Sequence, residues 1–426
     1  MKEFLSQTAN LNRAIVSDDF LKTLNIIGKR ISLTIHKYGT GTQCFDWIIP
    51  KKWSVRGAYI ETLSGKRILD WKNNPLHIVI GSLPVKRKKI ARADLLKKIY
   101  VSNEYPSHIP YQFKYYELDW GFCMSKDDAA KLSEEEYWIE IDSEYTEGNL
   151  LVGEHVIEGE SEKSIVLLSH IDHPGQVNDG LAGAAVLLAL AEELKEYKPT
   201  YTIRIQFLSE TIGSIAHLHN HQKIIPQILG AIFLEMPGTP AYPMVLQHSK
   251  QKNSRLDLIA AAVLRDSGEK VEYAECFKHV VNDDGFYNSP GIDVPCISLS
   301  RSKKLSPENW YHFPYYHTSG DSIENFDIDA AQRYLKYLKE ILEIANADHR
   351  ITKKYQGIPN LSRHGLWIDW RLYPKASQAI DSILFSLDDG VTIFDVAELT
   401  GVPFEEVNSF VKKLEEKDLV SLSIVV

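Results

Sequence analysis

Two histidines and two aspartates lie close together in the stretch IVLLSHIDHPGQVNDGLAG, residues 165–183: His170, Asp172, His173 and Asp179. A neutral imidazole and a carboxylate are ligands that zinc prefers in proteins. Asp172 stands two residues after His170, on the same side of an extended backbone, where it could hold the other imidazole nitrogen. A single His-x-Asp motif is usually incidental, so a metal site here is a hypothesis that other segments must support.

The residues around these four side chains predict a strand and then a helix. Residues 165–168 are continuously apolar with β-branched members, which is typical of a strand covered on both faces. Residues 181–194 have the length and composition of a buried helix. His170 and Asp179 would then lie at the carboxyl end of a parallel strand, the edge of an open α/β sheet where ligands bind.

Three later segments repeat this pattern. The strand candidates 202–208 and 230–234 are followed by Glu210 and Glu235, and the sequence Tyr-His-Thr-Ser-Gly-Asp at 316–321 places His317 before a helical segment. A carboxylate or an imidazole thus follows one predicted strand after another. A random soluble chain would rarely produce this pattern, so these segments strengthen the metal hypothesis.

The order of these motifs resembles that of the co-catalytic zinc aminopeptidases. The resemblance is closer to a bacterial branch described as aminopeptidase-like and often named with polysaccharide biosynthesis, which has an inserted β domain and a winged-helix tail. The motifs of that branch match nearly the whole length of this chain. They stand here as His170–Pro174, Asn178–Asp179, Ser289–Gly291 with Arg301, and Tyr316–Asp321.

The resemblance implies an α/β fold with a mostly parallel sheet wrapped by helices, and the distribution of residue types along the chain agrees with this fold. Short segments rich in Trp, Tyr, Ile and Val follow Gly39, and strands and helices alternate from about 137 to 362. We predict an N-terminal helix at 1–38 that packs on the catalytic domain, an inserted β-rich domain at 39–130, the catalytic domain at 131–370 and a winged helix-turn-helix domain at 376–426.

Both the fold and the net charge of the C-terminal segment, residues 376–426, can be predicted. Helices at 393–399 and 404–417, separated by Gly-Val-Pro at 401–403, and a closing strand at 421–426 form a helix-turn-helix with a possible wing. The tail carries ten acidic residues against three lysines, so contact with duplex DNA would be repulsive. We therefore expect a docking or dimerisation module.

In the aminopeptidase template, one metal takes the first histidine, a bridging aspartate and the last histidine. The resemblance assigns these positions to His170, Asp179 and His317, with His173 as the competing ligand. Three protein ligands leave a zinc one open position for water.

The second metal of the template takes the bridging aspartate, a glutamate and a later acid. A Glu-Glu pair supplies the general base and then the ligand, but this chain has Glu210 followed by Thr211. The resemblance thus makes Glu210 the base and leaves a ligand missing at Thr211. Glu235 could still hold a weaker second metal with Asp179, so we predict one firmly bound zinc.

Substrate contacts are implied in the same way. Carboxylates commonly hold a free α-amine in the family, and Asp283, Glu235 and Asp321 are placed to do so; Asp321 could instead orient His317. Arg301 could anchor a substrate carboxylate in a bidentate way or be a surface residue without a role. Aromatic residues at 108–116 either line the pocket or fill a core. The predicted catalytic residues are Glu210 and Asp172, the metal ligands His170, Asp179, His317 and Glu235, and the substrate contacts His173, Asp283, Arg301, Tyr316 and Asp321.

The implied reaction is hydrolysis of an amide or peptide bond next to a free amine. Two alternatives stay open. Loss of a ligand could indicate a non-peptide amide hydrolase or a cyclase in glycan metabolism, or a catalytically retired ligand-binding protein.

The amino-acid composition limits which binding partners and which cellular compartment we expect. The 426 residues carry 57 acids and 48 bases, a net charge of −9, which disfavours nonspecific binding to nucleic acid or anionic membranes. We expect a small-molecule or short-peptide substrate and a possible homo-oligomer. The four cysteines form no CxxC pair, the first residues lack the apolar core of a signal peptide, and the longest apolar stretch is too short to span a bilayer. These features predict a cytoplasmic protein.

Overall fold

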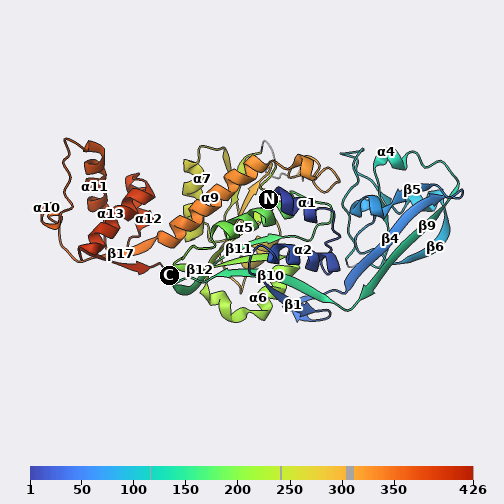
Figure 1. Cartoon of the computed structure of the whole chain (residues 1–426), viewed down its shortest axis with the longest axis horizontal. Coiled ribbons are helices and arrows are strands. Elements are labelled where there is room, and N and C mark those ends of the chain that lie inside the picture. Colours follow the sequence, from blue (N-terminus) through green and yellow to red (C-terminus); the bar gives the residue numbers. More distant parts are fainter. Residues whose placement is uncertain (116, 240–241, 304–310, 426) are drawn as a thin grey trace.

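An eight-stranded sheet forms the centre of the computed structural model, which describes residues 1–115, 117–239, 242–303 and 311–425 (Figure 1). The strand order is β1-β10-β12-β11-β13-β16-β14-β15, and the four strands from β12 to β16 run parallel. The predicted α/β class with a mostly parallel sheet is confirmed. The strands are β1 Thr34–Gly39, β10 Asn149–Ile157, β11 Ser161–His170, β12 Tyr201–Leu208, β13 Ile228–Glu235, β14 Met244–Gln247, β15 Val271–Ala274 and β16 Cys296–Arg301.

Helices cover both faces of this sheet. One face packs on a core that includes buried side chains of α1 Lys2–Thr8, α2 Asp18–Gly28, α5 Leu181–Glu193, α7 Arg255–Asp266 and α9 Ile328–Ala347. The other packs on α6 Ile212–Asn220 and α8 Asp283–Tyr287. Residues 285–287 lie in α8, and residues 288–291 follow this helix. The Asn282 side chain accepts a hydrogen bond from the Asp283 backbone and starts this helix.

Two of these helices form as their sequences predict. The α5 helix has apolar residues on all sides, and it is buried from Leu181 to Leu188 because it lies between the sheet and α9. The α2 helix begins after Ser17, whose hydroxyl accepts a hydrogen bond from the Phe20 backbone, and two aspartates follow in the first turn.

A smaller four-stranded sheet lies at one end of the molecule, in the order β5-β4-β9-β6 (Figure 1). Its strands are β4 Lys52–Thr62, β5 Arg67–Asp70, β6 Val85–Ala91 and β9 Glu136–Thr146, and it has its own core. The short elements nearby are β2 Gln43–Cys44, β3 Trp47–Ile48, α3 Arg92–Leu96, β7 Ile99–Tyr100, β8 Phe122–Cys123 and α4 Lys126–Ala129.

The predicted boundary at residue 130 is wrong for this smaller sheet. Strand β9 pairs with β4 from Tyr137 to Thr146, so the sheet extends past that boundary. The burial pattern of β9 explains why it belongs to the smaller sheet: Tyr137, Ile139 and Ile141 are buried and alternate with more exposed residues. Alternation of this kind belongs to an antiparallel strand with one solvated face, whereas the central strands are buried throughout.

The C-terminal segment lies at the opposite end and consists of helices and a two-stranded sheet (Figure 1). The elements are β17 His349–Lys353, α10 Leu361–His364, α11 Pro374–Ser386, α12 Ile393–Thr400, α13 Phe404–Glu416 and β18 Val420–Ile424. The two helices and the strand expected from the sequence are present within one or two residues; Val426, the last residue of the predicted strand, lies outside the described residues. Strand β18 pairs antiparallel with β17, and this segment has its own buried core.

Ion pairs join this segment to α7. Arg255 donates to Asp395 at 2.8 Å, and Arg265 pairs with Glu398 at 2.9 Å. The Phe394 backbone donates to the Asp348 carboxylate at 2.9 Å, and the Phe394 side chain is buried in the main core. The acidic side of α12 is therefore already used by basic residues of the same chain. Within the described part of the chain, no helix is long and apolar enough to cross a membrane.

We predict that the full-length protein does not bind duplex DNA at physiological salt. Helix α13 carries Glu405 and Glu406 in its first turn and offers no continuous cationic face for a phosphate backbone. The measurement is a mobility-shift assay on the intact chain and on a chain that ends at residue 375. Nanomolar, salt-dependent binding that disappears with the truncation would contradict this prediction.

Candidate metal centre

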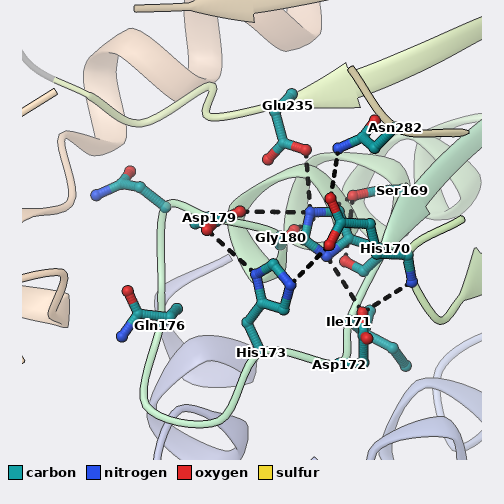
Figure 2. Close-up of polar contacts among 12 residues, drawn as sticks. Ser169, His170, Ile171, Asp172, His173, Gln176, Asp179, Gly180, Glu235 and Asn282 are labelled. Atoms are coloured by element: carbon teal, nitrogen blue, oxygen red, sulfur yellow. Dashed lines mark hydrogen bonds and ion pairs between the residues drawn. The ribbon is translucent and has the colours of Figure 1, made fainter. Parts of the chain in front are cut away.

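Several of the predicted site residues, among them His170, Asp179 and Glu235, meet at the carboxyl edge of the central sheet (Figure 2). His170 is the last residue of β11 and Glu235 the last of β13, the neighbouring parallel strand. Glu210 follows β12, the parallel neighbour on the other side. Asp179 lies two residues before the first residue of α5, and His317 comes from the loop before α9.

Asp179 lies at the centre of this cluster. Its Oδ2 is 2.7 Å from Nε2 of His317 and 3.1 Å from Nδ1 of His173, and its Oδ1 is 3.4 Å from Nε2 of His170. The Oε2 of Glu235 is 3.0 Å from the same His170 nitrogen. One carboxylate thus faces three imidazoles, and all but His317 are almost fully buried.

The potential ligand atoms form two groups that share Asp179. One contains His173, Asp179 and His317, the other His170, Asp179 and Glu235, and within each group the atoms lie within 4.8 Å of one another. His170 and His173 also form such a group with Asp172. In the part of the chain that the structure describes, five buried atoms of this cluster make no hydrogen bond: His170 Nδ1, His173 Nδ1, Asp179 Oδ2, Glu235 Oε1 and His317 Nε2.

These side chains fit a divalent cation. Several of their buried atoms approach one another closely without a hydrogen bond, which is the arrangement expected of ligands directed at a shared ion and a costly one without it. Imidazole nitrogens and carboxylate oxygens are the donor set that zinc prefers.

The structure corrects the predicted grouping of His170 with His317. His170 is directed across the edge to Glu235, and its ring stacks on Phe233 of the neighbouring strand with ring centres 6.2 Å apart. His173, which lies in the loop after β11, takes the place beside His317. The spacing within the motif did not reveal this because the loop determines where the second imidazole points.

Two buried groups fix that loop. The Asp321 carboxylate accepts hydrogen bonds from the backbone nitrogens of Val177, Asn178 and Asp179, at 2.8–3.2 Å. Burial raises the pKa of Asp321 to about 7. Asp321 therefore positions the backbone of Asp179. This differs from the two predicted roles, in which its carboxylate either oriented His317 or held a substrate amine.

Arg13, which the sequence analysis missed, holds the same loop from the N-terminal segment. Its guanidinium is fully buried and donates to the carbonyl oxygens of Ile171, His173 and Gln176, and burial lowers its pKa to about 10. No motif marks this residue, since a single arginine before a helix is ordinary in sequence.

Glycine is required beside His170. Gly180 has φ of +103°, and a Cβ there would lie 2.7 Å from Cε1 of the His170 ring. Both the left-handed backbone and the close approach exclude other residues. This glycine therefore lets the chain turn from Asp179 directly into α5.

Asp172 holds the outer nitrogen of His170, as predicted from the His-x-Asp spacing. Its Oδ1 is 3.3 Å from Nδ1 of His170 and also accepts a hydrogen bond from the Glu210 backbone at 2.9 Å. Asp172 thereby connects the end of β11 to the residue that follows β12.

Glu210 faces His173 and is held on its other side by Asn282. Its Oε2 is 3.0 Å from Nε2 of His173, and Asn282 donates to its Oε1 at 3.0 Å. Burial acts to raise the pKa of Glu210, but the charge and hydrogen bond of His173 outweigh it and lower the pKa to about 2. Asn282 was not predicted from the sequence, whereas its neighbour Asp283 was predicted as a substrate contact.

Asp283 lies behind this site. It accepts hydrogen bonds from the Thr211 backbone at 3.1 Å and from the Ser214 hydroxyl at 2.5 Å, and burial raises its pKa to about 7. Asp283 belongs to none of the ligand groups among the described residues. It supports Thr211, a residue with φ of +60°, at the position where a second glutamate was expected.

Arg301 lies apart from the cluster. It is buried at the end of β16, where it pairs with Glu269 at 2.5 Å and donates to the Tyr242 carbonyl oxygen at 3.0 Å. Neither of the two roles considered for it, substrate anchor or idle surface residue, describes this position.

Aromatic rings close the outer side of the site. Tyr316 stacks on His317 with ring centres 4.0 Å apart, and Tyr111 lies 5.0 Å from the His173 ring and 4.9 Å from the His317 ring. The Tyr111 backbone donates to the His317 carbonyl oxygen at 2.8 Å. Phe113, in the same aromatic run, is 52% exposed, and Tyr116 lies outside the described residues. Tyr111 thus brings the segment near the smaller sheet to the site.

Comparisons with known proteins agree on the type of fold. Residues 2–348 match a family model described as a domain of unknown function (DUF4910). A relative from Clostridium acetobutylicum is 30% identical over 417 residues, 96% of this chain and 93% of that protein. Its name is provisional: a polysaccharide biosynthesis protein with an aminopeptidase-like domain.

Two solved structures extend the comparison. One, provisionally named a peptidase and also from Clostridium acetobutylicum, has a TM-score of 0.90 and 28% identity over 99% of this chain and 96% of its own. The other, a zinc aminopeptidase from Bacillus subtilis, has a TM-score of 0.59 over 81% of this chain and 94% of its own. At 13% identity, the second likeness shows a shared fold alone.

Proposed function

This chain belongs to the DUF4910 family and has an aminopeptidase-like fold, and from these premises we propose that it is a zinc-dependent hydrolase of the aminopeptidase type. It would cleave an amide or peptide bond next to a free amine. The observation that carries this proposal is the convergence of three imidazoles and two carboxylates around Asp179, with the Glu210 carboxylate directly beside them.

We place the firm zinc site at His173, Asp179 and His317, a set of two imidazoles and one carboxylate. His170, Asp179 and Glu235 form the weaker site, because Thr211 brings no side-chain carboxylate to it. When bound, zinc supplies Lewis-acid polarisation of a carbonyl group and lowers the pKa of water towards ~7.

Glu210 acts as the general base in this proposal. The Asn282 amide fixes one of its oxygens, and the other lies 3.0 Å from Nε2 of His173, at the edge of the cluster. It takes a proton from the attacking water and then gives it to the leaving amine. Tyr111 and Tyr316 exclude bulk water from this space.

Glu235 is the best placed of the three proposed amine anchors. The Asp321 carboxylate accepts hydrogen bonds from backbone groups with both of its oxygens. Asp283 uses Oδ1 for Thr211 and Ser214, and both its Oδ2 and the Oε1 of Glu235 make no hydrogen bond in the described part of the chain. Of these two residues, Glu235 is the one that belongs to an Asp179-centred group. A substrate ammonium group would therefore meet Glu235, and short peptides or aminoacyl compounds are the proposed substrates.

A panel of substrates tests this function. After chelation and reloading with zinc, the protein should cleave aminoacyl anilides and dipeptides but not their N-acetylated forms, and the chelated protein should be inactive. Elemental analysis that finds no divalent metal after reloading would refute the enzymatic proposal.

Thr211 favours a second candidate, hydrolysis of a non-peptide amide, because it removes a ligand on which the two-metal aminopeptidases rely. The relative named for polysaccharide biosynthesis points in the same direction. The same panel should therefore include N-acyl amino sugars and an N-terminal glutamine peptide, whose cyclisation is detected by mass spectrometry. If the protein turned over only the N-acyl amino sugars or the glutamine peptide, the proposal of an aminopeptidase would be wrong and this second candidate would replace it.

A further inference from the structure

A second cluster of histidines lies at the other end of α6 from Thr211. His217 belongs to α6, His221 follows its last residue by one position, and His36 comes from the edge strand β1. The nine residues of α6 extend ~13 Å, so this cluster is distinct from the Asp179-centred site.

The three imidazoles are close enough to share one ion. Each offers a nitrogen, and these nitrogens lie within 4.8 Å of one another. The rings of His217 and His221 stack with centres 4.3 Å apart, and His36 lies edge-on to both at 4.9 Å. His217 and His221 are four residues apart, the spacing at which two histidines of a helix bind zinc on one face.

A hydrogen bond on the outer nitrogen of His221 sets the tautomer that a metal needs. The Nδ1 of His221 lies 2.9 Å from the His217 carbonyl oxygen, and because a carbonyl only accepts, Nε2 of His221 keeps its lone pair. The Nδ1 of His217 contacts the Tyr38 hydroxyl at 3.0 Å. Its Nε2 is buried and makes no hydrogen bond within the described chain.

Glu154, from β10, lies beside two of these imidazoles. Its Oε2 is 3.3 Å from Nε2 of His36, and its Oε1 is 3.6 Å from Nε2 of His217. Tetrahedral zinc with bonds of ~2.0 Å separates its ligand atoms by ~3.3 Å, whereas N–H···O hydrogen bonds are ~2.7–3.2 Å long. The separations therefore resemble those between ligands more than those of hydrogen bonds.

The other contacts of Glu154 leave one oxygen for an ion. Gln206 donates to Oε1 at 3.1 Å and Arg204 to Oε1 at 3.4 Å, so Oε2 faces His36. The Glu154 carboxylate is buried beside these imidazoles.

We propose that His36, His217, His221 and Glu154 form a second zinc site, which fastens the C-terminal end of α6 to strands β1 and β10. All four ligands come from the protein, and a closed set of this kind is typical of a structural zinc. Because α6 begins directly after Glu210, the ion would also stabilise the helix that follows the proposed catalytic base.

The test compares the zinc content of the wild-type chain with that of a His36→Ala, His221→Ala double variant. Both side chains are partly exposed and lie outside the Asp179-centred cluster, so their removal should leave the fold intact, as checked by circular dichroism. The control is His219→Ala, from the same helix, because the His219 ring instead accepts a hydrogen bond from the Phe45 backbone at 3.0 Å.

After dialysis against chelator and titration with Zn²⁺, the double variant should bind about one zinc fewer than the wild-type chain and the control. Zinc should also raise the melting temperature less in the double variant than in the other two proteins. Equal zinc content and equal thermal shifts in all three proteins would overturn the proposal. The result is independent of turnover, so failure of the hydrolase proposal and failure of this one are distinguishable.

Discussion

Replacement of Glu210 by glutamine should reduce turnover by about 100- to 10,000-fold, which is the usual contribution of a general base. The amide keeps the size of the carboxylate and can still contact His173 and Asn282, but it cannot accept a proton from water. Zinc content should stay at the wild-type level because Glu210 belongs to neither Asp179-centred group. Initial rates and elemental analysis of the same preparation measure both effects.

Glu192→Gln is a suitable control for this substitution. Glu192 pairs with Arg30 at a partly exposed position remote from the site, so its replacement should alter neither rate nor metal content. If Glu210→Gln loses zinc together with activity, Glu210 is a ligand and another residue must be the base.

Replacement of Asp179 by asparagine should have the largest effect on metal binding. Asp179 belongs to both groups, and the neutral amide removes the negative charge that faces three imidazoles. Loss of a partner that only orients a ligand typically weakens metal binding by ~10- to 100-fold, so loss of this shared ligand should exceed that range. Competition with a chromophoric chelator measures the affinity.

Asp321→Asn separates the role of a ligand from that of a support. Asp321 fixes the backbone of Asp179 without belonging to either group, so its replacement should cost no more than ~10- to 100-fold in zinc affinity. Equal losses in the two variants would show that Asp179 acts only through the position of its loop.

The sequence predicted the central elements well because their signals are local. Continuous apolar runs identified β11, β12 and β13, and the carboxyl ends of parallel strands meet at one edge, which placed His170 and Glu235 together. The resemblance drawn from the motifs is also confirmed by the 30% identical relative and its aminopeptidase-like name. The spacing of apolar residues and the order of the motifs along the chain are sufficient for inferences of this kind.

Directions of side chains beyond the strand ends were not predictable in the same way. Whether His170 or His173 stands beside His317 depends on the loop that Arg13 and Asp321 hold, and neither contact has a local signal. Asp283 and Asp321 were expected to face a substrate, yet both serve backbone groups. Carboxylates in a cleft and carboxylates that support its walls look alike in sequence.

The residues of the candidate metal centre come from distant positions in the chain, and this determines when the centre can form during synthesis. Arg13 supports a loop at 171–179, and His317, which completes the first ligand group, is 304 residues later in the chain than Arg13. At ~5–20 residues per second, a ribosome needs roughly 15 to 60 seconds to add that length. Until then a nascent chain has the two histidines of β11 and its loop but lacks the third, so the group around His317 is complete only after about three quarters of the 426 residues have been joined.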